Sequence, residues 1–137
     1  MGVIHKFTGR DGGWDWEGVS MADFGSARPD VTVRRFIGRQ DDSCNLELRY
    51  FELGPGACSN WESHNYEHAV LILRGRGSVR LSGEILPIGC GDAVFVPAGE
   101  VHEFMAAEDE ALGFMCAVLD RELRVTVHGE QTLAKFN

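Results

Sequence analysis

The sequence predicts an all-β protein, either a barrel or a sandwich, built from short strands in one domain. Short segments rich in Val, Leu, Ile and Phe follow one another from residue 31 onward, and Gly, Pro, Asp or Asn residues separate them. The chain holds 17 glycines, which suits a fold with many tight turns. No window of helical length keeps its apolar residues at the helical spacing, so the fold class is all-β.

In chain order, the first expected element is an extended N-terminal arm over residues 1–30. Glycines interrupt this segment repeatedly, while Trp14 and Trp16 provide bulk that can anchor it. We expect the arm either to cover the barrel or to be exchanged with a partner subunit. Residues 31–128 then form the barrel, and residues 129–137 form a C-terminal tail.

Strands of the barrel are expected wherever an apolar run lies between turn residues. Glycine and proline end the second run at residues 54–56 and precede the sixth at residues 97–99. The acidic residues 108–110 form a solvated turn before the seventh run. In chain order, the expected strands are residues 31–37, 45–53, 68–73, 78–81, 93–96, 102–106, 112–119 and 123–128.

The alternation of side chains along a strand indicates which residues share the barrel interior. His102 and Phe104 lie on one face of their strand, and His68 begins the equivalent inward set of its own strand. Arg49 and Phe51 share a face as well, and we expect that face to line the cavity.

Composition excludes several classes of partner. The formal net charge of −8 at pH 7 argues against nucleic acid and anionic membrane surfaces as partners. No apolar run approaches the roughly 18 residues that a membrane helix needs. The first residues contain no signal-peptide core, and the four cysteines show no CxxC pair. We therefore expect a reduced, cytoplasmic protein with a small-molecule substrate.

Four side chains in two glycine- and proline-rich segments have the chemistry of a metal site. Glu62, His64 and His68 lie in the first segment, and His102 lies in the second. Imidazole nitrogens with one carboxylate oxygen suit a single divalent ion of Fe, Mn, Ni, Co or Zn. Glu62 has an alternative role as a hydrogen-bonding or base residue beside a metal held by three histidines.

Further residues are candidates for the substrate pocket. If Arg49 faces inward, its buried guanidinium needs either an acidic partner or an anionic ligand, and the sequence leaves both interpretations open. Phe51 and Phe104 are candidates for an apolar wall. Cys116 can reach the interior, where a cysteine is more often a small apolar residue than a catalytic one.

The two segments resemble the motifs of the cupin superfamily. The second motif, G-x5-P-x-G-x2-H-x3-N, matches Gly91, Pro97, Gly99 and His102, with Ala106 in place of the terminal Asn. The first motif, G-x5-H-x-H-x3,4-E-x6-G, matches in spacing, but its ligand types are permuted. The residues at its three ligand positions, in the order His, His and Glu, are Glu62, His64 and His68.

The resemblance implies a single-domain jelly-roll barrel, a double-stranded β-helix, that forms a homodimer. It also implies a metal-dependent enzyme for a small carboxylate- or carbonyl-bearing molecule. An Fe(II) dioxygenase is the leading expectation, and iron is the favoured metal. A non-redox isomerase or lyase of sugar acids is one alternative, and a cupin that binds a small ligand without turnover is another.

Overall fold

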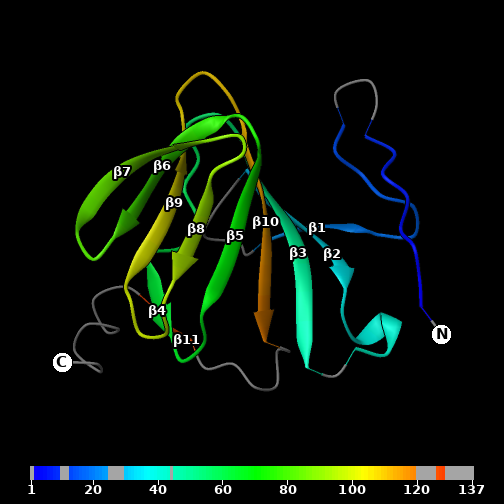
Figure 1. Cartoon of the computed structure of the whole chain (residues 1–137). Helices are drawn as coiled ribbons and strands as arrows, with labels where there is room; N and C mark the ends of the chain where they lie inside the picture. The colour runs from blue at the N-terminus through cyan, green and yellow to red at the C-terminus, as the bar shows by residue number, and fades with distance from the viewer. Residues whose placement is uncertain (1, 10–12, 25–29, 44, 120–125, 129–137) are drawn as a thin grey trace.

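Two antiparallel sheets face each other in the computed structural model, which describes residues 2–9, 13–24, 30–43, 45–119 and the backbone of 126–128 (Figure 1). The larger sheet has six strands, in the order β1 (Met21–Asp23), β2 (Val31–Ile37), β3 (Leu46–Leu53), β10 (Leu112–Leu119), β5 (His68–Arg74) and β8 (Ala93–Val96). The smaller sheet has five, in the order β11 (Thr126–His128), β4 (Glu62–His64), β9 (His102–Ala106), β6 (Arg76–Leu81) and β7 (Glu84–Gly89). This is the all-β jelly-roll architecture that the sequence predicts.

Most predicted strands coincide with observed ones, and the missed strands lack the expected pattern. β1 is fully exposed, and β4 has only three residues, all of them polar or charged. β7 contains Pro87 and buries only Ile88, so it shows no alternation of apolar and polar residues. It lies at the edge of the smaller sheet, where a proline is tolerated. Of the predicted strand 123–128, the described residues form β11, and the predicted tail 129–137 lies outside the described residues.

The hydrophobic core lies between the two sheets and consists of the inward-facing side chains of their strands. Each fully buried aliphatic or aromatic side chain of this kind stabilises a fold by about 1.5–3 kcal/mol. The most deeply buried aliphatic members are Val31, Val33, Leu53, Ile72, Val79, Val96 and Leu112. Apart from the short 3-10 helix η1 (Arg39–Asp41), the described residues contain no helix, and none therefore that could cross a membrane.

The N-terminal arm packs on the outer face of the larger sheet. The ring of Trp14 stacks on Tyr50 with the centroids 5.7 Å apart, and Trp16 meets Phe36 edge-on at 4.2 Å. Tyr50 is fully buried, although it points away from the barrel interior. In this chain the arm therefore covers its own barrel, and its exchange with a partner subunit stays a prediction.

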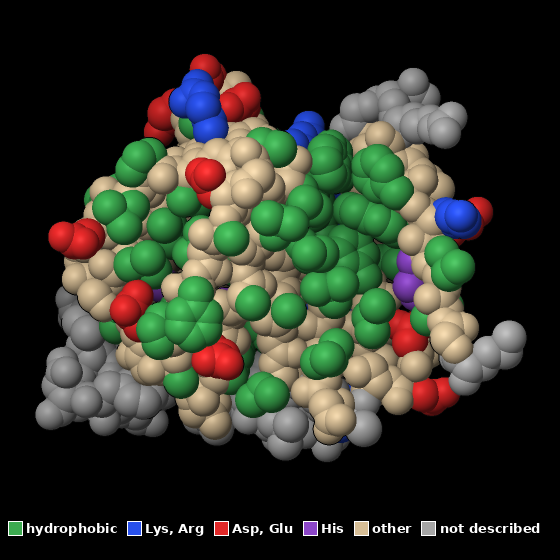
Figure 2. Space-filling model, in the orientation of Figure 1, with side chains coloured by type: hydrophobic (Ala, Val, Ile, Leu, Met, Phe, Trp, Pro, Cys, Tyr) green, Lys and Arg blue, Asp and Glu red, His purple; other side chains and the backbone are tan. Residues whose placement is uncertain are grey.

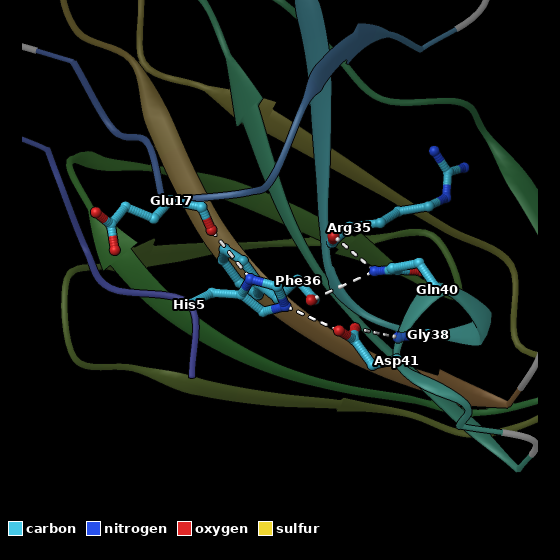
Figure 3. A network of polar contacts seen from close by, with 7 residues as sticks. All are labelled: His5, Glu17, Arg35, Phe36, Gly38, Gln40 and Asp41. Carbon is cyan, nitrogen blue, oxygen red and sulfur yellow. Dashed lines mark hydrogen bonds and ion pairs between the residues drawn. The ribbon is translucent and has the colours of Figure 1, made fainter. Parts of the chain in front are cut away.

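His5 links the arm to the turn that follows β2 (Figure 3). Its Nδ1 lies 3.0 Å from the carbonyl oxygen of Glu17, and its Nε2 lies 3.0 Å from Oδ1 of Asp41. Both partners accept hydrogen bonds, so both favour the doubly protonated ring and raise the pKa of His5 above its usual value. His5 is thus a satisfied histidine outside the barrel interior.

The outer face of the larger sheet is apolar beyond the arm, and Figure 2 shows hydrophobic side chains gathered there. These residues alternate with the core residues along β3, β10, β5 and β8, and they are half-buried or exposed. An exposed apolar sheet face is typical of a surface that another molecule covers. The homodimer expected from the sequence stays a prediction. The residues of this face are Leu46, Leu48, Ala69, Leu71, Leu73, Phe95, Met115, Ala117 and Leu119.

Candidate functional site

Three buried histidines from three strands meet inside the barrel. His64 ends β4, His68 begins β5 after a tight connection, and His102 begins β9. Their ring centroids lie 4.5, 4.8 and 5.1 Å apart, and one potential ligand atom from each ring lies within 4.8 Å of the others. The permuted first motif thus places its two histidines beside the histidine of the second motif.

Hydrogen bonds fix the orientation of the three rings. Nδ1 of His64 donates to the carbonyl oxygen of Tyr66 at 2.8 Å, and Nδ1 of His102 donates to that of Glu100 at 2.9 Å. A carbonyl oxygen can only accept, so each of these Nδ1 atoms carries the hydrogen and Nε2 carries the lone pair. Metal-binding histidines commonly have such a partner on the second nitrogen. Tyr66 also stacks on the ring of His64 at 3.8 Å.

His68 completes the group. Its Nε2 lies 2.8 Å from Nε2 of His64, and its Nδ1 lies 2.9 Å from the Sγ atom of Cys116. Two ring nitrogens at this distance need a hydrogen atom or a cation between them, because two lone pairs repel. Since His64 presents a lone pair, either His68 donates a hydrogen or a cation takes its place. Three neutral imidazoles form a donor set that Fe, Mn, Co, Ni or Zn ions accept, so the residues fit a divalent metal.

Burial keeps His64 and His102 neutral. It lowers the pKa of His64 to about 4, with further lowering from His102 and Arg49, and it also lowers the pKa of His102. A metal ligand must be unprotonated, so both rings are ready to bind an ion at neutral pH.

The metal-free protein is expected to lose stability as the pH falls from 6.5 toward about 4. The unfolded chain takes up a proton at His64 near pH 6.5, whereas the folded chain takes it up only near pH 4. The stabilising contribution is therefore complete above pH 6.5 and is lost across that interval. Thermal unfolding of chelator-treated protein at a series of pH values measures it. His64→Asn, which cannot titrate, should show a smaller pH dependence, and equal dependence in both proteins would contradict the assignment.

Glu62 lies near the histidines without joining them. Its backbone pairs with that of His102 across β4 and β9, and it lines the same cavity. Its carboxylate lies outside the group of three side chains that can share an ion. The structure thus places Glu62 in the cavity lining, and its roles as a direct ligand or as a base both stay predictions.

Glu62→Gln is expected to weaken metal binding by less than about tenfold, and so by less than the loss of a histidine. The amide keeps the size of the side chain and removes its charge and its basicity. Metal titration and turnover of the same preparation separate its possible roles. Unchanged affinity with lost turnover would identify a base, whereas a loss of affinity as large as that of a histidine variant would identify a ligand.

A cavity of about 320 Å³ opens beside the histidines, a size suited to a small molecule. All four residues expected from the sequence to form the pocket line it, together with residues from both sheets. The lining residues are Phe24, Arg35, Arg49, Phe51, Ser59, Asn60, Glu62, Tyr66, His68, His102, Phe104, Phe114 and Cys116.

One wall of the cavity is aromatic. Phe114 stacks on Phe104 with the centroids 4.5 Å apart and on Phe51 at 5.6 Å, and Phe24 meets Phe51 edge-on. This wall offers an apolar surface for the uncharged part of a ligand and keeps water away from that side of the cavity.

The cavity also has charged lining residues, two arginines that share one carboxylate. Arg49 pairs in register with Arg35 on β2 and with Cys116 on β10, so the three form a row across the larger sheet. Oε1 of the buried Glu47 lies 3.3 Å from Nε of Arg35 and 3.7 Å from Nε of Arg49. The sequence left open whether Arg49 has an acidic partner or binds an anionic ligand. The structure gives it an acidic partner, and it also places Arg49 in the cavity lining, where a ligand can contact it. The two guanidinium groups suit an anionic ligand, although the carboxylates of Glu47 and of Glu62, which also lines the cavity, equal them in number.

Sequence reasoning missed Arg35 as a lining residue of this cavity and Glu47 as the buried carboxylate that pairs with its arginines. Both lie on the inward face of their strands. Arg35 is two residues from the buried Val33 and four from Val31, and Glu47 is two residues from Arg49, so each pair shares a face. The alternation rule could have found them if it had been applied to charged residues as well as to apolar ones.

Comparisons with known proteins give consistent results. A family model described as a cupin domain matches residues 49–119. A 1-methylthio-D-xylulose 5-phosphate methylsulfurylase of Rhodospirillum rubrum is 40% identical over 106 residues, which cover 75% of this chain and 67% of that protein.

Two solved structures share the fold. A cupin-2 domain protein of Rhodospirillum rubrum is 34% identical with a TM-score of 0.75, and the match covers 88% of this chain and 82% of that chain. A cupin 2 conserved barrel domain protein of Rhodopseudomonas palustris is 30% identical with a TM-score of 0.77, and the match covers 97% and 91% of the two chains.

Proposed function

Because the chain belongs to the cupin family, we propose that it is a metal-dependent enzyme for a small anionic carbonyl compound. We infer further that the compound is a phosphorylated keto-sugar with a methylsulfanyl group beside the carbonyl, from which the enzyme removes that group. The observation that carries the proposal is the set of three buried imidazoles beside a cavity that two arginines line.

His64, His68 and His102 would hold the metal. When bound, a divalent ion supplies a Lewis acid that polarises a carbonyl group and so favours bond breaking at the neighbouring carbon. The tight hydrogen bonds to the carbonyls of Tyr66 and Glu100 support this role, because they keep the rings in place without a ligand.

Other lining residues would contact different parts of the substrate. Arg35 and Arg49 provide the charge that attracts and orients a phosphate, for which arginine is well suited. The aromatic wall of Phe51, Phe104 and Phe114 suits an apolar substituent such as a methylsulfanyl group.

The substrate class rests on the Rhodospirillum rubrum relative, whose name describes transfer of a sulfur-containing group from a sugar phosphate. The Fe(II) dioxygenase expected from the sequence is therefore the less favoured candidate. The proposed reaction resembles the isomerase or lyase alternative in that the metal only polarises a carbonyl, but it takes a keto-sugar phosphate in place of sugar acids and consumes a thiol as reductant.

The test uses protein loaded in turn with Mn²⁺, Zn²⁺ or Fe²⁺ and incubated with 1-methylthio-D-xylulose 5-phosphate and a small thiol. Nuclear magnetic resonance is expected to show the keto-sugar phosphate without its methylsulfanyl group, formed equally well without O₂. Turnover that needs both iron and O₂ would instead support a dioxygenase. Thermal stabilisation by the compound without any product would support a binding protein.

A further inference from the structure

The cavity ends at two stacked phenylalanines, Phe104 on β9 and Phe114 on β10. Both side chains are buried, and the ring centroids lie 4.5 Å apart with an angle of 27° between the ring planes. Rings stacked this closely are in van der Waals contact, so no alkyl chain passes between them. Their register partners on the next strands, Val79 on β6 and Ile72 on β5, are buried and do not line the cavity. The two rings therefore form a closed end with packed core behind it.

Neighbouring residues hold this closed end in place. The backbone N–H of Ser59 donates to the carbonyl oxygen of Phe104 at 2.8 Å, and the Ser59 hydroxyl accepts a hydrogen bond from the N–H of Phe104, also at 2.8 Å. Phe114 also stacks on Phe51, with the centroids 5.6 Å apart. Protein interiors are close-packed, so a ring in such a position cannot move aside without displacing its neighbours. A ligand group that is too long for the space in front of the rings therefore clashes with them.

The positions of the arginines and histidines decide which part of a ligand meets the closed end. Phe104 is two residues from His102 on the inward face of β9, about 7 Å along the strand. Phe114 on β10 lies two strands from Arg35 on β2, about 10 Å across the larger sheet. A keto-sugar phosphate with its charged group at Arg35 and its carbonyl at the histidines therefore directs the substituent beside the carbonyl toward the closed end.

We propose that Phe114, together with Phe104, determines specificity by restricting the alkyl group on the substrate sulfur to about the size of methyl. This inference rests on the proposed function, because it concerns the group that the enzyme removes. A methyl group needs little space beyond the sulfur, whereas a propyl chain has to enter the volume that the ring of Phe114 fills. A single methylene group changes selectivity in an apolar pocket by about 10- to 200-fold, so the closed end selects methylsulfanyl over longer alkylsulfanyl groups.

The test is a competition between 1-methylthio-D-xylulose 5-phosphate and its 1-propylthio analogue, with metal-loaded protein and a small thiol. Nuclear magnetic resonance follows the disappearance of each compound, and the ratio of the two rates gives the ratio of their kcat/KM values. The wild-type protein is expected to consume the methylthio compound at least about tenfold faster. Phe114→Val, which shortens the side chain and keeps it apolar, should lower that ratio by about tenfold or more. Because both compounds meet the same preparation, partial unfolding of the variant does not alter the ratio.

Leu112→Ala is the matched control. Leu112 lies two residues from Phe114 on the same face of β10 and is fully buried, but it does not line the cavity. This variant should lose thermal stability as Phe114→Val does, and it should keep the wild-type ratio of rates. If Phe114→Val does not fold, Phe114→Leu, a milder change of the same kind, takes its place and should shift the ratio in the same direction.

Three results would overturn the inference and leave the proposed function standing. The first is equal consumption of the two compounds by the wild-type protein, and the second is an unchanged ratio in the Phe114 variant. The third is an equally large change of the ratio in Leu112→Ala, which would assign the selectivity to the packing of the whole barrel rather than to the ring of Phe114. A wild-type protein that consumes neither compound would overturn both the inference and the proposed function.

Discussion

Replacing His64 with alanine is expected to lower the affinity for a divalent metal by at least about 100-fold, because the variant loses a ligand rather than a supporting group. His64 is the histidine whose Nε2 atom is held closest to that of His68, and its Nδ1 is fixed by the carbonyl of Tyr66. The remaining two histidines cannot enclose an ion from three sides. Isothermal titration or competition with a coloured chelator measures the change.

His5→Ala provides the matched control for this experiment. His5 also has both ring nitrogens in polar contacts, but it lies on the arm outside the barrel and lines no part of the cavity. It should retain the affinity of the wild-type protein. Full metal occupancy in His64→Ala, measured by elemental analysis after dialysis, would refute the assignment of His64 as a ligand.

Arg49→Met should raise KM for a phosphorylated keto-sugar by about 100-fold or more and lower stability by about 3 kcal/mol. The loss of binding follows from removing a buried guanidinium that lines the cavity. Stability falls because the carboxylate of Glu47 is only 1% exposed and would lose one of the two arginines that pair with it. Of the ion pairs seen here, it would keep the one with Arg35. Steady-state kinetics and chemical denaturation measure the two effects separately.

The double variant Glu47→Gln with Arg49→Met distinguishes binding from stability. Removing the buried carboxylate should recover much of the lost stability, since a charge without a strong partner no longer has to be buried. KM should stay high, because the guanidinium is still absent. A normal KM in either variant would show that Arg49 serves the fold alone, as the partner of Glu47.

The fold was predictable because its signals are local. Strands such as β2, β8, β9 and β10 begin and end where turn residues interrupt apolar runs, and their predicted limits match the structure. β1, β4 and β7 were missed because they are short, exposed or contain proline, and they form through pairing with neighbouring strands. Such pairing depends on residues that are distant in the sequence, so no local pattern records it.

The sequence predicted which histidines form the candidate site, but not how the surrounding charged side chains are arranged. The spacing of His64, His68 and His102 follows known motifs, and the structure brings all three together. The same motifs could not place the carboxylate of Glu62, because its direction depends on how β4 pairs with β9. The sharing of Glu47 by two arginines likewise follows from the register of β2 on β3, which the sequence does not state.

The most direct test of the metal centre is an anomalous-difference map from crystals of the protein soaked with Zn²⁺ or Mn²⁺, recorded at the absorption edge of the metal. We expect one strong peak about 2.0–2.2 Å from the Nε2 atoms of His64, His68 and His102. A peak at another position, or no peak in crystals that contain the metal in solution, would contradict the proposal that these histidines hold a divalent ion.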